Sequence, residues 1–168
     1  KVLEQESLTY LESSEVDARV KEQEQTVLQY LSNERGVYSI EEMEDAMQKV
    51  MDTYAGGIRT NYQYNEKQLA MAEEKIKNLI SLSEQLKAED MHELLFLYEL
   101  KERLVVCLTL IAHLRARKET RWHVFGENQD YPNKSEQGKC FVNSKLENGE
   151  IHVIYRDLDS LAQVEWNV

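Results

Sequence analysis

The sequence predicts a mainly α protein, in which a bundle of three to four helices is followed by a long loop and a C-terminal β-hairpin. Apolar residues recur at steps of three and four in the first two thirds of the chain, there is one proline, and an Asn-Gly dipeptide separates two short apolar runs near the C-terminus. A chain of 168 residues suits one hydrophobic core. We expect one domain made of an acidic N-terminal helical segment (1–38), a helical bundle (39–122), and an ordered loop with a hairpin (123–168).

The first predicted helix runs from Leu11 to Leu31. Its apolar residues are sparse and imperfectly spaced among many Glu and Gln. The first 45 residues hold twelve Asp and Glu against four Lys and Arg. This pattern is typical of an exposed helix that needs a partner surface, and Gly36 is expected to end it.

Three further helices begin at recognisable N-terminal caps, in which a Ser, Asn or Asp is followed three residues later by Glu or Gln. These pairs are Ser39 with Glu42, Asn65 with Gln68, and Asp90 with Glu93. The helix after Ser39 carries a stripe of methionines, which we interpret as core packing and not as a copper site, because no His or Cys joins it. Gly56 and Gly57 are expected to end that helix.

The helix after Asp90 is apolar on nearly every side, so we expect it to be buried on several sides. It does not predict membrane insertion, because charged residues interrupt it well before the roughly 20 apolar residues that a membrane span needs. These residues are Glu99, Lys101, Glu102 and Arg103.

Beyond Arg121 the sequence changes character. Gly, Asn, Asp and Pro are frequent between Gly126 and Gly138, which predicts a long ordered loop. Two strands, 140–144 and 151–155, then flank Asn148-Gly149, a dipeptide suited to a tight turn in which both residues have positive φ. The last ten residues fit either a short strand or a free tail.

Composition excludes several classes of partner. With a formal charge of −11, the chain is not expected to bind nucleic acid. The cluster Arg115, Arg117, Lys118 and Arg121 is interpreted as cationic side chains near a helix C-terminus. Two cysteines make no disulfide framework, and no secretory signal is visible, so a reducing, cytoplasmic location is expected.

No catalytic constellation is visible in the sequence. The four histidines lack the spacing of a zinc helix, so no metal site is expected. His113 is interpreted as a hydrogen-bonded core histidine in preference to a poised base. No glycine-rich phosphate loop or nucleophile motif occurs, because Gly56-Gly57 stands alone between helices. The chain is therefore expected to hold no cofactor and no catalytic residue.

The stretch Arg117 to Trp122 is the most unusual local feature, because charges and a large aromatic residue close the buried helix. One interpretation is a helix cap with a network between Glu119 and Arg121 and with Trp122 wedged against the loop. The other is a docking edge for another domain. We give both equal weight.

Five segments in order resemble the C-terminal domain of the fumarate reductase, succinate dehydrogenase and adenylylsulfate reductase flavoproteins. They are Met51–Gly57 (Met-Asp-Thr-Tyr-Ala-Gly-Gly), Glu89–Leu94, Arg117–Trp122, Asp130–Pro132 and Cys140–Ser144. The resemblance covers roughly residues 45–158. The segment Glu119–Trp122 (Glu-Thr-Arg-Trp) is more similar to adenylylsulfate reductase α subunits than to succinate dehydrogenases. The latter usually have Glu-Ser-Arg-Gly-Ala-His at this place. His123 departs from the proline expected there.

This resemblance implies a helical bundle and hairpin that support the flavin domain of a longer oxidoreductase chain. FAD and the catalytic residues would lie on the parent's other parts, and the isolated fragment would be inactive. Glu119, Arg121 and Asp130, with Trp122, would order the loop and the domain interface. Implied partners are the parent's FAD-binding domain and an iron–sulfur subunit, and the isolated domain is expected to self-associate. The alternative is a self-standing acidic helical interaction module.

Overall fold

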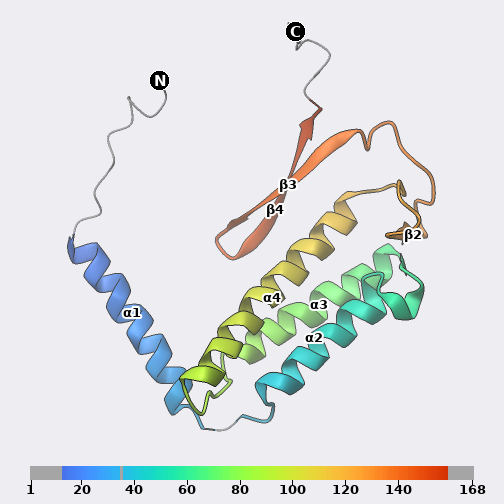
Figure 1. The fold of residues 1–168 in the computed structure, drawn as a ribbon. Helices are drawn as coiled ribbons and strands as arrows, with labels where there is room; N and C mark the ends of the chain where they lie inside the picture. Colours follow the sequence, from blue (N-terminus) through green and yellow to red (C-terminus); the bar gives the residue numbers. More distant parts are fainter. Residues whose placement is uncertain (1–12, 35, 159–168) are drawn as a thin grey trace, which may run out of the picture.

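A computed structural model describes residues 13–34 and 36–158. It confirms a mainly α fold with a C-terminal hairpin (Figure 1). The helices are α1 (Ser13–Ser32), α2 (Ile40–Tyr54), α3 (Glu66–Ser83) and α4 (Met91–Ala116), with a 3₁₀ turn η1 (Ile58–Thr60). The strands are β1 (Gln63–Tyr64), β2 (Glu127–Asn128), β3 (Cys140–Glu147) and β4 (Glu150–Asp157).

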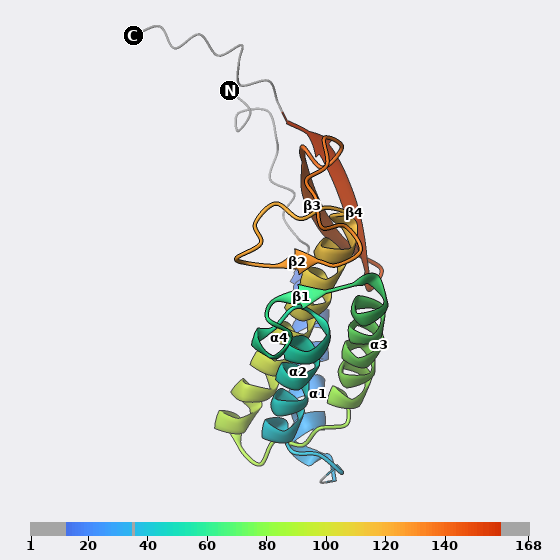
Figure 2. The ribbon, with the colours of Figure 1, turned by 90° about the vertical axis from the view of Figure 1, so that its right-hand side faces the viewer.

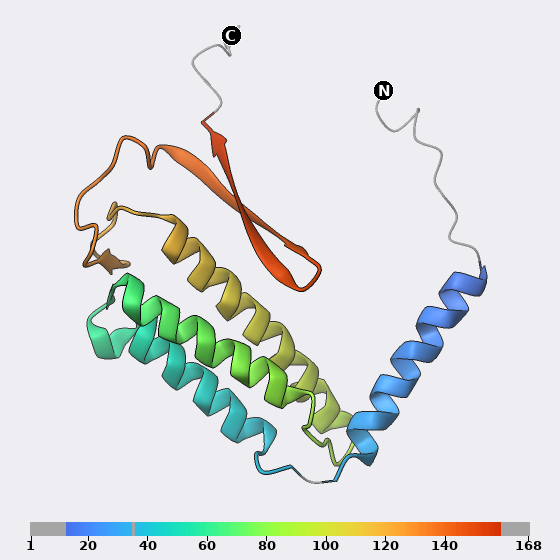
Figure 3. The ribbon, with the colours of Figure 1, turned by 180° about the vertical axis from the view of Figure 1, so that it is seen from behind.

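Helices α2, α3 and α4 lie side by side and enclose the core, while the loop and hairpin lie at the end where α4 finishes (Figures 2 and 3). Helices α2 and α3 each contribute one apolar stripe to this core, as their spacing predicts, and α4 contributes part of its apolar surface. Fully buried core residues include Met43 from α2, Leu69 and Ile76 from α3, and Leu97 and Leu104 from α4. The bundle therefore forms the rigid support on which the loop is built.

The three predicted caps are present. Ser39 and Glu42 form a reciprocal capping box at the start of α2. The other two are simple caps: Asn65 accepts a hydrogen bond from the Gln68 amide, and Asp90 accepts bonds from the His92 and Glu93 amides in the first turn of α4. These caps satisfy amides that have no partner within the helix, and they explain why the helix starts were predictable.

Helix α1 ends at Ser32, four residues before Gly36, and it contacts the bundle only near that end (Figure 1). The Tyr30 side chain is 1% exposed. The Ala88 amide donates to the Tyr30 carbonyl at 2.9 Å, and the Asn33 side chain donates to the Leu86 carbonyl at 2.9 Å. These bonds to the segment between α3 and α4 end α1 before Gly36, where the sequence predicted its end. Sequence periodicity contains no signal for such long-range bonds.

Helix α4 is less buried than its composition predicts. Six of its large apolar side chains are exposed: Met91, Leu95, Phe96, Val105, Val106 and Leu110. The expectation of burial on several sides is therefore wrong for this part of α4, because α2, α3 and the hairpin leave one flank of it uncovered. Within the described ranges, no helix combines the length and apolarity that crossing a membrane requires.

Strands β3 and β4 pair antiparallel around Asn148 and Gly149, whose φ angles of 52° and 80° confirm the predicted turn. The hairpin is tied to α4 by a 3.0 Å hydrogen bond between His113 and Ser144 and by the Tyr155 hydroxyl, which donates to the Ala116 carbonyl at 3.1 Å. The alternatives for the last ten residues concern 159–168, which lie outside the described residues.

Candidate functional site

The carboxylate of Glu119 is the centre of the loop that follows α4, and its side chain is only 1% exposed. Arg121 donates to it through Nε at 2.5 Å, Arg117 donates at 3.2 Å, and the Ser135 amide donates at 2.9 Å. One buried anion is thus held by two guanidinium groups and a backbone amide. Such charge-assisted bonds are stronger than neutral ones.

The pKa of Glu119 lies below its ordinary value. Burial alone raises the pKa, but the hydrogen bonds from Arg121 and the Ser135 amide, and the positive charges of both arginines, outweigh burial and lower it. Glu119 is therefore ionised at neutral pH, where its negative charge holds Arg117 and Arg121 together.

Both arginines also bind backbone carbonyls further along the loop. Arg117 donates to the carbonyls of Gly138 and Cys140, and Arg121 donates to that of Ser135. Gly138 packs so closely on Glu119 that a Cβ atom there would lie 2.2 Å from the carboxyl carbon. The network therefore joins the end of α4 to the start of β3.

Thr120 is the second buried anchor of the loop, with 2% exposure. Its hydroxyl accepts from the Asn128 amide at 3.0 Å and donates to the Tyr131 carbonyl at 2.9 Å. Asn128 lies in β2, which pairs in parallel with β1 before α3. The two-residue strands were not predicted, because their pairing depends on this tertiary contact.

Asp130 binds a different part of the domain from Glu119. Its carboxylate accepts from the Glu66 amide at 2.7 Å, in the first turn of α3. A negative charge at a helix N-terminus is favourable, because it binds a free amide and complements the helix dipole. Asp130 therefore ties the loop to α3, while Glu119 and Arg121 tie it to the hairpin.

Trp122 is 72% exposed, so it is not wedged against the loop. Val124 and Phe125 are exposed to 79% and 82%. The amides of Phe125 and Gly126 both donate to the Trp122 carbonyl, which closes a tight turn. We call Trp122, Val124 and Phe125 the apolar edge.

A groove of about 810 Å³ lies behind the apolar edge. Its walls are mainly apolar, and its charged lining includes the Glu119 network. Apolar lining residues include Tyr64, Leu114, Trp122, Phe125, Phe141 and Leu158. Sequence reasoning singled out Trp122 but missed Phe125 and Gly138; the apolar pair Val124-Phe125 in a polar loop was an available signal for the former, and there was none for the latter.

The Gly56-Gly57 turn does not suit the phosphates of a dinucleotide such as FAD. Gly56-Gly57 lies between α2 and η1, and a Cβ on Gly57 would lie 2.4 Å from the Asp52 carboxylate. Asp52 also accepts from the Arg59 amide at 3.1 Å. The turn that could approach a phosphate is therefore filled by an anion, which repels one. Within the described part of the chain, no group of three or more His, Cys, Asp or Glu could hold a metal ion.

Comparison with known proteins gives structural matches alone. No family model and no curated sequence matches the chain. Adenylylsulfate reductase from Archaeoglobus fulgidus matches with a TM-score of 0.81 and 30% identity, over 99% of this chain and 28% of the reductase chain. The E. coli quinol fumarate reductase flavoprotein matches with a TM-score of 0.74 and 16% identity, over 90% of this chain and 26% of its own, which shows the fold alone.

The resemblance predicted from the sequence is therefore confirmed: the chain has the fold of the C-terminal domain of the adenylylsulfate and fumarate reductase flavoproteins. Identity is higher to the adenylylsulfate reductase, in line with the Glu119–Trp122 segment. The chain spans about a quarter of the length of these neighbours.

Proposed function

We propose that this chain is the C-terminal helical domain of an FAD-dependent oxidoreductase of the fumarate reductase, succinate dehydrogenase or adenylylsulfate reductase type. Its role is to support the flavin domain and to dock other parts of the enzyme. The observation that carries the proposal is the match over 99% of this chain but only 28% of the reductase chain. The acidic interaction module is not favoured, because a free-standing module has no reason to share this fold at 30% identity.

In this proposal FAD binds to the parent's other domain and supplies the redox chemistry there. The residues of this chain bind and orient that domain and exclude water from the contact. An iron–sulfur subunit is a further proposed partner, and the isolated domain is proposed to self-associate through its uncovered apolar side chains. All three follow from the family resemblance and the exposed apolar surface, and each needs its own test.

The apolar edge is the proposed contact with the flavin domain. Three large apolar side chains within four residues are each more than 70% exposed, and aromatic residues are enriched at protein interfaces. The turn that carries them is fixed by Thr120 and the Glu119 network. A preorganised edge loses little conformational entropy on docking, which favours binding.

Replacing Trp122 and Phe125 by Ala in the full-length parent is expected to weaken retention of FAD about tenfold or more, since interface aromatics contribute most to binding. Bound flavin is measured by its visible absorbance after gel filtration. Val37→Ala is the matched control, because Val37 is 89% exposed but far from the edge in the sequence and fold. Equal flavin retention in the double variant and the control contradicts docking through the edge.

The proposal as a whole is tested by the gene. An upstream reading frame that encodes a dinucleotide-binding domain supports it. A start codon directly before Lys1 contradicts it and favours the alternative of a self-standing acidic interaction module.

A further inference from the structure

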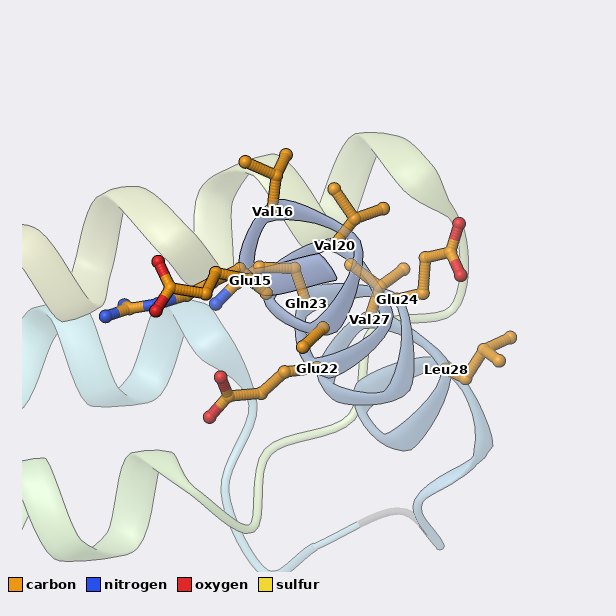
Figure 4. A pocket seen from close by; sticks show the side chains of 10 residues that line it. Glu15, Val16, Val20, Glu22, Gln23, Glu24, Val27 and Leu28 are labelled. Carbon is orange, nitrogen blue, oxygen red and sulfur yellow. The ribbon is translucent and has the colours of Figure 1, made fainter. Parts of the chain in front are cut away.

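Helix α1 carries an apolar seam that is only half covered. Val16, Val20, Gln23, Val27 and Tyr30 recur at steps of four and three, the spacing of the contact line in paired helices. Exposure decreases along this seam, from 42% at Val16 and 50% at Val20 to 1% at Tyr30, and Val27 packs against the core. Figure 4 shows Val16, Val20, Gln23 and Val27 among the residues that line the hollow beside α1, with Val16 and Val20 on one side of the helix and Glu22 on another.

The covered half of the seam contacts a helix. The Tyr30 ring packs edge-on against Tyr98 of α4, with centroids 6.2 Å apart. Lys101 of α4 donates to the Tyr30 hydroxyl at 2.5 Å, and that hydroxyl donates to Glu84 at 2.8 Å. This cluster holds the end of α1 against α4 and fixes the direction in which the rest of α1 leaves the bundle.

Beyond this cluster the two helices diverge, as Figures 1 and 3 show. On α4, Val105 lies one turn after Lys101 and on the same helix face as Tyr98, and it is 40% exposed. Both helices thus carry exposed apolar side chains beyond the cluster: Val16 and Val20 on α1, and Val105 on α4. The uncovered seam continues the contact that Tyr30 and Val27 already make with α4.

The charges beside the seam are mostly negative. Asp17 and Glu24 immediately follow seam positions, and Glu15 and Glu22 lie within one turn, against Arg19 and Lys21. A helix that pairs with this seam is therefore favoured when Lys or Arg residues flank its own apolar stripe.

We propose that an amphipathic helix with basic flanks, from the flavin-binding part of the same parent chain, fills the angle between α1 and α4. The inference rests on the proposed function. In such a parent, the flavin-binding part belongs to the same polypeptide as α1. This covalent link gives it a higher effective concentration at the seam than a separate subunit has. The apolar edge and the α1 seam are then two contacts with one domain.

Hydrogen exchange in the full-length parent tests this inference. Residues 16–24 of α1 are exposed among the described residues, and their amides should exchange at least ten times more slowly in the parent. Val16→Asp with Val20→Asp in the parent should restore fast exchange. Ala18→Asp is the matched control, because Ala18 is exposed on the same helix, away from the seam, and it should leave the protection intact.

Fast exchange of amides 16–24 in a parent whose apolar edge is protected overturns this inference and leaves the proposed function standing. Protection that appears only after a second subunit is added assigns the seam to that subunit and also overturns it. Protection that rises with protein concentration assigns the seam to a second copy, with the same consequence. A parent without a flavin domain overturns the proposed function and this inference together.

Discussion

Replacing Glu119 by Ala is expected to lower the free energy of unfolding of the 168-residue chain by about 3 kcal/mol, because removing one member of a buried ionic cluster leaves the others uncompensated. Arg117 and Arg121 would face each other without the anion between them, and the Ser135 amide would lose its acceptor. The measurement is urea denaturation followed by circular dichroism.

Glu119→Gln is the matched control, because it keeps the size and one acceptor oxygen but removes the charge. We expect a smaller loss, about 1–2 kcal/mol, since a neutral amide forms weaker bonds to the arginines. An Ala variant within about 0.5 kcal/mol of the original chain, the range typical of ordinary surface positions, would show that the cluster does not order the loop.

The charge of Glu119 also predicts a pH dependence. Its pKa in the folded chain is lowered from the ordinary value of 4.5, so the ionised form is favoured by folding. The resulting stability is fully present above the unfolded pKa and is lost as the pH falls through the folded pKa. The original chain should therefore lose stability below about pH 4.5 more steeply than Glu119→Gln, as measured by urea denaturation between pH 3 and 7. If the free energy of unfolding depended on pH in the same way in both proteins, the result would contradict a stabilising role for the Glu119 charge.

The helices were predictable because their signals are local. Ser39, Asn65 and Asp90 cap their own helices, and Asn148-Gly149 sets its own turn. The early end of α1 was not predictable, since it depends on Asn33 and Leu86 meeting across the fold. The same holds for the exposed flank of α4, because composition says how apolar a helix is but not which neighbours cover it.

The candidate site, too, was only partly predictable from the sequence. The proximity of Glu119 and Arg121 follows from their separation by one residue. The exposure of Trp122 does not, because it depends on the turn that the Phe125 and Gly126 amides close on the Trp122 carbonyl. Of the two interpretations of Arg117–Trp122, the structure shows the Glu119–Arg121 network of the first and an exposed Trp122, while the docking edge stays a prediction.

Gly138→Ala is expected to destabilise the chain by about 2–3 kcal/mol, within the range that overpacking of a filled site costs. Its Cβ would lie 2.2–2.3 Å from the carboxyl atoms of Glu119. A free carboxylate would move aside at little cost. This one is held by Arg117, Arg121 and the Ser135 amide, so moving it breaks those bonds. Thermal and urea denaturation of the variant give the change.

Gly126→Ala is the matched control in the same loop, because its Cβ would meet only Tyr64, at an ordinary contact distance of 3.4 Å. A double-mutant cycle then separates the clash from any general effect on the loop. Combined with Glu119→Ala, the Gly138→Ala substitution should cost little further stability, since the atoms that it strikes are gone. Additive losses in the double variant would mean that Gly138 acts on backbone conformation and not through Glu119. A coupling of about 2 kcal/mol would show that the tight contact between the two residues joins the end of α4 to the hairpin.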